Sequence, residues 1–457
     1  MEIIKTIFYF AITIGILVLV HEFGHFIAAK LSKMKVEVFS IGFGTRLIGK
    51  KIGETDYRIS AFPLGGYVKI AGMVDESLDT GFVSSKPEPY EFRSKPFYQK
   101  FFVITAGVIM NMILAVFLFW AIFMVEGKTF RNVNEVGYVI PNSPAFEAGF
   151  REGDKILTLN GRKINYWDDI IRTAFVDDLT KDLSFEVQRD GEKIFISIPR
   201  TKISEFSSED ALGILPAHVE VMVMAVEPGR PAQKIGIQSK DVIVSVNDEK
   251  IYSPAQLTSI IKSNAGKEIT LKIKRGDKIF DQKITPDADG RIGVQIASFY
   301  NGPVKKESYN PLEALWIGVR ETYRVSALTV NGIKQLITGK IPFQKGVAGP
   351  IRIAKFATRS ADAGFTAFLG FMAILSISLA FLNIFPFPGL DGGHLAILVV
   401  EAIIRRELSY RVKVAIQQAG IIILIILMIF VLYNDIVHFY HSILFFFNCY
   451  HFIFILI

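Results

Sequence analysis

The chain has 457 residues, of which 51% are hydrophobic and 39 are Phe. This apolar content exceeds that of a purely soluble protein, so part of the chain is expected to lie in lipid. The net charge is +7, but the basic residues form no Arg-rich tract, which excludes nucleic acid as an expected partner. The surplus charge is expected to face anionic lipid headgroups of the bilayer instead. The single Cys excludes a disulfide framework and a cysteine zinc cluster.

Four stretches are apolar enough to cross a bilayer, which takes about 20 helical residues. Basic residues follow the first stretch, precede the second, and separate the third from the fourth, which predicts cytoplasmic loops at these places. The long segment between the second and third stretches is then expected on the opposite side. The four stretches are 3–29, 101–125, 365–385 and 414–433.

The segment between the second and third stretches contains an internal repeat. The sequence SPAFEAG, which begins at Ser143, recurs as RPAQKIG from Arg230, 87 residues later. Such self-similarity indicates two tandem copies of one domain, each with short helices, an alternating strand after an Asp, and a hairpin. We expect the copies to cover residues 127–217 and 218–300.

Each copy resembles the PDZ domain in its bacterial, circularly permuted form. The resemblance implies that extended peptides or C-termini bind by adding a strand to a sheet edge. The candidate peptide-binding residues are Gly213 and Ile214 in the first copy, and Gly293 and Val294 in the second. A glycine there allows backbone N–H groups to turn toward a carboxylate. A strand with a glycine bulge and no ligand is an alternative of equal weight.

The rest of the chain is assigned to the membrane and its surface. Residues 301–363 have the profile of an amphipathic helix on the membrane surface, although a soluble helix that faces a partner would look similar. Alternating residues near 35–39 and 55–59 predict a small β-sheet close to the headgroups. The membrane core is expected at 1–126 and 364–435, and it is followed by a hydrophobic tail at 436–457 that forms either a fifth span or an interfacial segment.

His21, Glu22 and His25 form the pattern His-Glu-x-x-His inside the first span. On a helix this spacing puts both imidazoles on one face, with the carboxylate beside them. Two neutral imidazoles supply half of a tetrahedral zinc site, and the carboxylate can accept a proton from the attacking water. A structural role would require buried partners for three ionisable groups at a depth where each charge costs about 2.5–3.5 kcal/mol.

A third metal ligand is expected from the segment 383–394, where prolines and glycines break the helix after the third span. Irregular backbone at membrane depth is tolerated only where it faces protein or water, so the break suggests a site. Asp391 is the strongest candidate, and His394 is a weaker alternative. Asp391 could instead cap a helix that begins at Leu395. The first and third spans run in the same direction, so both motifs reach the cytoplasmic side of the bilayer.

These motifs resemble those of the bacterial site-2 proteases. The resemblance rests on the pattern in the first span, on Asn383 through Gly392, and on the two PDZ-like domains, and it covers about residues 3–435. It implies zinc ligands at His21, His25 and Asp391, and a catalytic base at Glu22. The implied fold is a polytopic α-helical membrane core of about four spans, with a membrane-associated β-loop and two tandem PDZ-like α+β domains.

The resemblance also implies substrates and a location. The substrates would be single-pass membrane proteins, notably an anti-sigma factor already trimmed by another protease, and remnant signal peptides. The protein would lie in the bacterial inner membrane, with a cytoplasmic-side active site and periplasmic PDZ domains that filter substrates. A catalytically inactive PDZ scaffold is the alternative, and Asn111 could be a simple tie between helices. The implied substrate-binding residues are Asn383, Pro386, Pro388, Gly65, Gly66 and Asn111.

Overall fold

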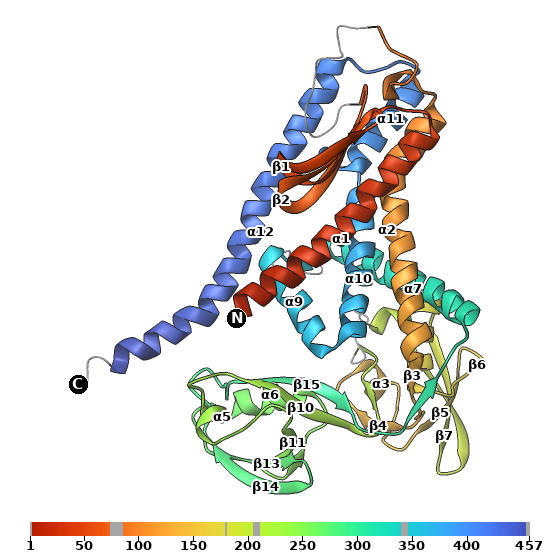
Figure 1. Cartoon of the computed structure of the whole chain (residues 1–457). Coiled ribbons are helices and arrows are strands. Elements are labelled where there is room, and N and C mark those ends of the chain that lie inside the picture. The colour runs from red at the N-terminus through yellow and green to blue at the C-terminus, as the bar shows by residue number, and fades with distance from the viewer. Residues whose placement is uncertain (1, 74–85, 179–180, 204–210, 340–345, 454–457) are drawn as a thin grey trace. The chain divides into compact units, whose positions relative to one another are not determined.

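The computed structural model describes the chain except for residues 1, 74–85, 179–180, 204–210, 340–345 and 454–457. At 43, 62–64, 176 and 437–453 it describes the backbone alone. The chain divides into two compact units (Figure 1). We call Met1–Gly127 with Ser308–Ile457 the membrane unit, and Lys128–Glu307 the repeat unit.

Four helices of the membrane unit are long and apolar enough to span a bilayer, which confirms the four predicted spans. The tail expected at 436–457 continues the last of these helices as far as Ile453. The helices are α1 (Glu2–Leu31), α2 (Phe97–Glu126), α10 (Phe365–Ile384) and α12 (Tyr410–Ile453).

Proline and glycine set the ends of two spans. Helix α2 begins directly after Pro96 and is followed by Gly127, whose φ of 71° is readily adopted by glycine. Helix α10 is followed by Phe385, which is extended (φ −62°, ψ 134°) because Pro386 disfavours helical geometry in the residue before it. The chain then runs through a short loop to α11 (Asp391–Ile404).

The predicted β-sheet is a bent hairpin of β1 (Val36–Ile52) and β2 (Thr55–Ile70), longer than the strands expected from sequence. The first half of β1 pairs with both ends of β2, since Ile41 is opposite both Gly66 and Ile59. Within the described residues the second half of β2 pairs with β1 alone. Figure 1 shows the hairpin beside α1, which β2 contacts.

Two further helices, α7 (Pro311–Ile337) and α9 (Pro350–Ala363), fall in the segment expected to lie on the membrane surface. Helix α7 packs closely on α2, because a Cβ on Gly318 would lie only 2.9 Å from the backbone nitrogen of Trp120. Large apolar residues of α7, including Trp316 and Tyr323, stay exposed. This outer face fits an amphipathic helix.

The repeat unit contains two copies of the same succession of elements, as the repeated sequence predicted. The first copy consists of β3 (Lys128–Arg131), β4 (Val136–Val139), α3 (Pro144–Glu147), β5 (Lys155–Leu159), β6 (Arg162–Lys163), α4 (Trp167–Arg172), β7 (Leu183–Arg189), β8 (Glu192–Ile198) and β9 (Ile214–Pro216). The second consists of β10 (Val219–Val226), α5 (Pro231–Lys234), β11 (Val242–Val246), β12 (Glu249–Lys250), α6 (Pro254–Ser263), β13 (Ile269–Arg275), β14 (Lys278–Ile284) and β15 (Val294–Tyr300), and β16 (Val304–Glu307) returns to pair with β3.

Each copy has its own apolar core. The core of the first copy is formed by residues between Val136 and Ile214, and that of the second by residues between Val221 and Ile292. The last strand of each copy pairs with its first core strand, β9 with β4 and β15 with β10. The two copies therefore repeat one fold as well as one sequence pattern.

Candidate metal centre

The two imidazoles of the His-Glu-x-x-His pattern lie together on the inner face of α1. His21 and His25 are both buried, and their Nε2 atoms are 3.2 Å apart. Residues four apart on a helix occupy the same face one turn apart, which accounts for the convergence. The pair therefore presents two nitrogen lone pairs to one point.

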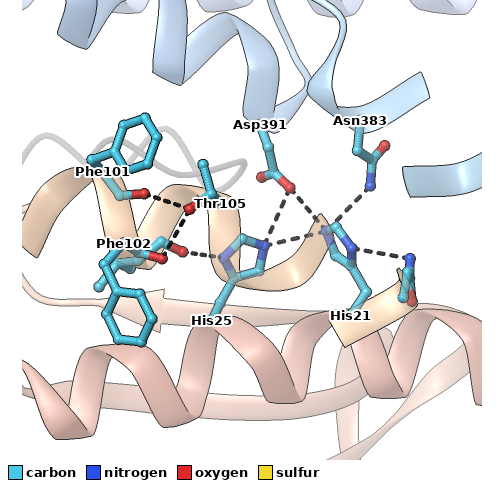
Figure 2. A network of polar contacts seen from close by, with 9 residues as sticks. His21, His25, Phe101, Phe102, Thr105, Asn383 and Asp391 are labelled. Carbon is cyan, nitrogen blue, oxygen red and sulfur yellow. Dashed lines mark hydrogen bonds and ion pairs between the residues drawn. The ribbon is translucent and has the colours of Figure 1, made fainter. Parts of the chain in front are cut away.

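Asp391 meets this pair from α11, as Figure 2 shows. Its Oδ2 lies 3.0 Å from Nε2 of His21 and 3.3 Å from Nε2 of His25. Helix α11 begins at Asp391 itself, and its N-cap is Leu390, without a side-chain hydrogen bond. The alternative that Asp391 caps a helix beginning at Leu395 is therefore wrong.

The helix begins earlier than expected because its glycines pack rather than break it. A Cβ on Gly392 would overlap the carbonyl oxygen of Phe385, and one on Gly393 would overlap that of Phe387. Glycine at these positions lets the first turn of α11 lie directly against the loop that precedes it. Asp391 is thereby held at the N-terminus of α11 and points toward α1.

The donor set fits a zinc ion. His21, His25 and Asp391 each offer one ligand atom, and these atoms all lie within 4.8 Å of one another. Ligand atoms about 2.0–2.2 Å from a tetrahedral zinc are about 3.3 Å apart, close to the spacings observed. Moreover, Oδ2 of Asp391 is buried without a hydrogen bond, although two imidazole nitrogens lie near it. Lone pairs that converge in this way are what a cation requires.

A backbone carbonyl orients His25. Its Nδ1 lies 2.8 Å from the carbonyl oxygen of Val103 in α2, which can only accept a hydrogen bond. The hydrogen of the neutral ring must therefore be on Nδ1, so that Nε2 keeps its lone pair toward Asp391. This contact selects the tautomer that a metal ligand needs.

Asn111 of α2 occupies the equivalent place behind His21. Its amide nitrogen lies 3.3 Å from Nδ1 of His21, and its Oδ1 is buried without a partner. The two ends of an amide are assigned from hydrogen bonding rather than seen. If the amide is rotated by half a turn, Oδ1 of Asn111 accepts a hydrogen bond from Nδ1 of His21, so both of these atoms have a partner. Asn111 then fixes the tautomer of His21 as Val103 fixes that of His25.

Gly107 of α2 leaves room for the centre. A Cβ at this position would lie 2.7 Å from Nε2 of His21 and would overlap Nε2 of His25. Any side chain there would displace the ligand atoms. The close approach of α2 to the imidazoles thus depends on a residue without a side chain.

The centre opens into a cavity of about 490 Å³. Glu22 lines the cavity beside the two imidazoles, and the second half of β2 forms another wall. Gly65 and Gly66, expected as substrate-binding residues, lie in this wall. Asn383 also lines the cavity, with its amide nitrogen 3.2 Å from Nε2 of His21.

The other expected residues lie away from the ligand atoms. Pro386 and Pro388 belong to the loop between α10 and α11. His394 lines the cavity, but its Nδ1 lies 3.3 Å from the amide nitrogen of Gln417 and it is not part of the ligand cluster.

The candidate peptide-binding loops of the repeat unit are packed. Gly213 and Gly293 are buried with positive φ, and their carbonyl oxygens accept hydrogen bonds from Ile140 and Glu227 respectively. Ile214 in β9 is also buried, as are its neighbours in that strand, whereas Val294 in β15 is partly exposed. The two copies therefore present different strand surfaces.

Two residues near the centre were missed by sequence reasoning. Val103 acts through its backbone, which no side-chain pattern reveals. Gln417 belongs to a helical segment whose sequence gives no sign of proximity to the cluster. Gly107 stands one turn before Asn111, in the segment of the second span to which the resemblance points.

The family model described as peptidase family M50 matches residues 9–427 of the chain. The chain belongs to peptidase family M50. Together with the ligand cluster and the candidate spans, this membership makes it an intramembrane zinc metalloprotease of that family.

Curated relatives match over nearly the whole chain. The regulator of sigma E protease of Haemophilus influenzae is 34% identical over 448 residues, which cover 93% of this chain and 97% of that protein. The regulator of sigma-E protease RseP of Escherichia coli K12 is 32% identical, with the same coverage of both chains. Among solved structures, the PDZ domain of the SdrC-like protein from Listeria monocytogenes matches 17% of this chain and 85% of that one, with 27% identity and a TM-score of 0.15.

Proposed function

We propose that this protease hydrolyses peptide bonds of single-pass membrane proteins at the centre formed by His21, His25 and Asp391, with Glu22 as the catalytic base. The observation that carries the proposal is the convergence of three ligand atoms beside a cavity that Glu22 lines. The ligands come from two helices of the membrane unit, one of which is a candidate span.

The chemistry follows from the placement of the side chains. Zinc, when bound, acts as a Lewis acid that activates a water and polarises the scissile carbonyl. The Glu22 carboxylate accepts the proton of the attacking water and passes it to the leaving nitrogen, as a general base and then a general acid. Val103 and Asn111 hold the two imidazoles with Nε2 inward throughout this cycle.

Substrate binding requires an extended chain, because a helix hides its carbonyls in internal hydrogen bonds. The second half of β2 supports such binding, since it lines the cavity and pairs on one side with β1. A substrate segment that adds to β2 as a strand would present its carbonyls in sequence. Asn383 would then hold a freed backbone group of the substrate near the metal ligands.

The natural substrates proposed are an anti-sigma factor already trimmed by another protease, and remnant signal peptides. The names of the relatives, which describe regulators of sigma E, support the first of these. We propose that the repeat unit acts as the filter that admits only trimmed substrates.

We further propose a location in the bacterial inner membrane, with the metal centre toward the cytoplasm and the repeat unit in the periplasm. The basic loop at 405–413 between α11 and α12 supports this orientation. Single cysteines introduced at Arg406 and at Lys278 of the repeat unit, in a chain that carries Cys449→Ser, test it in whole cells. An impermeant thiol reagent should label only the second position, and labelling of only the first would contradict the orientation.

Cleavage of a model single-pass substrate by wild type and by Glu22→Gln tests the function. The variant should retain zinc and lose cleavage, because the amide cannot accept the proton. A matched His21→Ala variant should lose both. Equal cleavage by wild type and Glu22→Gln would overturn the mechanism, and wild-type protein that binds no zinc and cleaves nothing would instead indicate an inactive scaffold.

A further inference from the structure

We propose that Gln417 of α12 is a positioning residue that holds Asp391 at the metal centre. The inference rests on the proposed role of Asp391 as a metal ligand. Gln417 is not part of the ligand cluster. Its side chain contacts Gly389 and His394, which flank Asp391 in the chain. Its side chain joins the last span to the loop that carries the ligand.

The contacts of Gln417 are directional. The residue is only 3% exposed, and its Oε1 accepts a hydrogen bond of 2.6 Å from the backbone N–H of Gly389. A backbone N–H can only donate, so this contact fixes which end of the amide is the oxygen. The amide nitrogen must then point toward Nδ1 of His394, which lies 3.3 Å away. Both partners therefore lie close to Asp391 in sequence, one before it and one after it.

His394 completes this arrangement as an acceptor. Because the amide nitrogen of Gln417 can only donate, Nδ1 of His394 must carry the lone pair. The ring is thereby held by α12 rather than turned toward the ligand atoms. This explains why the nearest further imidazole on α11 stays outside the metal cluster.

Steric contact reinforces the hydrogen bonds one turn further along α12. A Cβ on Gly420 would overlap the carbonyl oxygen of Pro388, so the helix backbone lies directly against the loop. On the same loop, Gly389 has a φ of 91° and a Cβ there would lie 3.0 Å from Leu424. The loop cannot approach α12 further, and the hydrogen bond from Gly389 keeps it from moving away.

The loop needs this support because α11 begins without a side-chain cap. A side-chain cap commonly stabilises the first turn of a helix by about 1 kcal/mol, and here that turn carries the ligand. Gln417 provides the missing restraint from a different helix. In addition, Ile421 on the next turn of α12 lines the catalytic cavity. One edge of α12 thus contacts both the space for substrate and the loop that carries Asp391.

Neighbouring glutamines on α12 provide a matched experiment. Gln417 is buried, whereas Gln418 is exposed. We would compare Gln417→Met with Gln418→Met in the purified full chain, by zinc competition against a chromophoric chelator and by the absorption spectrum of the cobalt-substituted protein. Met preserves length and removes both hydrogen bonds. Gln417→Met should weaken zinc binding by about 10–100-fold, the usual effect of removing an outer partner of a metal ligand, and should shift the cobalt spectrum.

A conservative variant distinguishes the loss of the hydrogen bonds from misfolding. Gln417→Glu keeps the acceptor for Gly389 and should recover most of the zinc affinity, with helicity and elution volume unchanged in all variants. Identical zinc affinity and cobalt spectra for Gln417→Met and Gln418→Met would overturn the inference. His21→Ala separates the two proposals. If His21→Ala abolishes zinc binding while Gln417→Met leaves it unchanged, only the role of Gln417 is wrong. If His21→Ala leaves zinc binding unchanged, the proposed metal centre is wrong as well.

Discussion

Aspartates with buried carboxylate oxygens occur in both units, but the surroundings of Asp154 and Asp241 differ from those of Asp391, whose Oδ2 is buried while its side chain is 19% exposed. In the repeat unit, Asp154 and Asp241 are 0% and 1% exposed. Each receives two hydrogen bonds from one guanidinium, Asp154 from Arg189 at 2.6 and 2.7 Å, and Asp241 from Arg275 at 2.7 and 2.7 Å. In the membrane unit, Oδ2 of Asp391 receives no hydrogen bond and faces two imidazole nitrogens.

The difference separates a structural carboxylate from a functional one. A buried charge costs several kcal/mol unless it is paired and hydrogen-bonded, and the repeat unit meets this condition twice with the same Asp–Arg arrangement. A cation between Oδ2 of Asp391 and the imidazoles would supply the missing partner. Oδ1 of Asp56 also lacks a hydrogen bond but lies 3.4 Å from Arg46, so what distinguishes Asp391 is that its oxygen faces two imidazole nitrogens.

The largest expected effect comes from Asp391→Ala. Zinc affinity should fall by more than the roughly 10–100-fold that an outer partner contributes, because a ligand itself is lost. The metal-free variant should unfold at the same temperature as metal-free wild type, since no hydrogen bond to Oδ2 is removed. Zinc competition and thermal unfolding measure the two effects. A much lower unfolding temperature would place Asp391 with the structural aspartates and break the comparison.

Asp241→Ala should show the opposite behaviour. Arg275 is 37% exposed and can be solvated, but the N–H of Gln238 loses its acceptor, so the second copy should be destabilised by about 1–3 kcal/mol. Faster amide hydrogen exchange in β11 and β13 would report this, while zinc affinity should not change. Asp277→Ala is the control, because Asp277 is exposed in the same copy and does not have a positive φ. Equal exchange in the two variants would contradict a structural role for Asp241.

Asn111→Ala should have an intermediate effect on the metal centre. Loss of the partner of His21 should weaken zinc binding by about 10-fold or more. Ser376→Ala is the control, since the Ser376 hydroxyl donates to the backbone carbonyl of Asn111 and thus joins α10 to α2 without touching an imidazole. If both variants bind zinc like wild type, Asn111 is a tie between helices.

The smallest expected effect is a dependence of the stability of the second copy on acidic pH. Burial alone would raise the pKa of Asp241, but the hydrogen bonds from Arg275 and from the N–H of Gln238 outweigh it and hold the pKa below the usual 3.8. A lowered pKa in the folded state stabilises the fold above the usual value, and this stability is lost as the pH falls below 3.8. The stability difference between wild type and Asp241→Asn should therefore shrink on acidification below that value. A difference that stays constant there would contradict this origin.

The cluster of His21, His25 and Asp391 was expected from the sequence, because each part of it has a local sign. The spacing of His21 and His25 specifies one helix face, and a helix break at membrane depth drew attention to Asp391. The start of α11 was predicted too late, because Gly392 and Gly393 look like helix breakers in sequence. In the structure both allow close packing, which depends on contacts with Phe385 and Phe387.

Residues that act across the fold were harder to predict. The contact of Val103 with His25 uses a backbone carbonyl, which every residue possesses. Gln417 is one of two adjacent glutamines, and only the packing of α12 decides which of them turns inward. The double pairing of β1 likewise depends on a bend in the hairpin rather than on the alternation of its side chains.

The closeness of glycine backbone to the catalytic cavity has a consequence for drug resistance. Gly107 leaves space beside the imidazoles, and a Cβ on Gly66 would lie 2.7 Å from the carbonyl oxygen of Ser40. Substitutions at either position would damage the enzyme itself. An inhibitor that binds through the backbone of Gly66, which lines the cavity, would therefore meet a surface that mutation cannot readily alter, whereas one that binds exposed side chains could be evaded by single mutations.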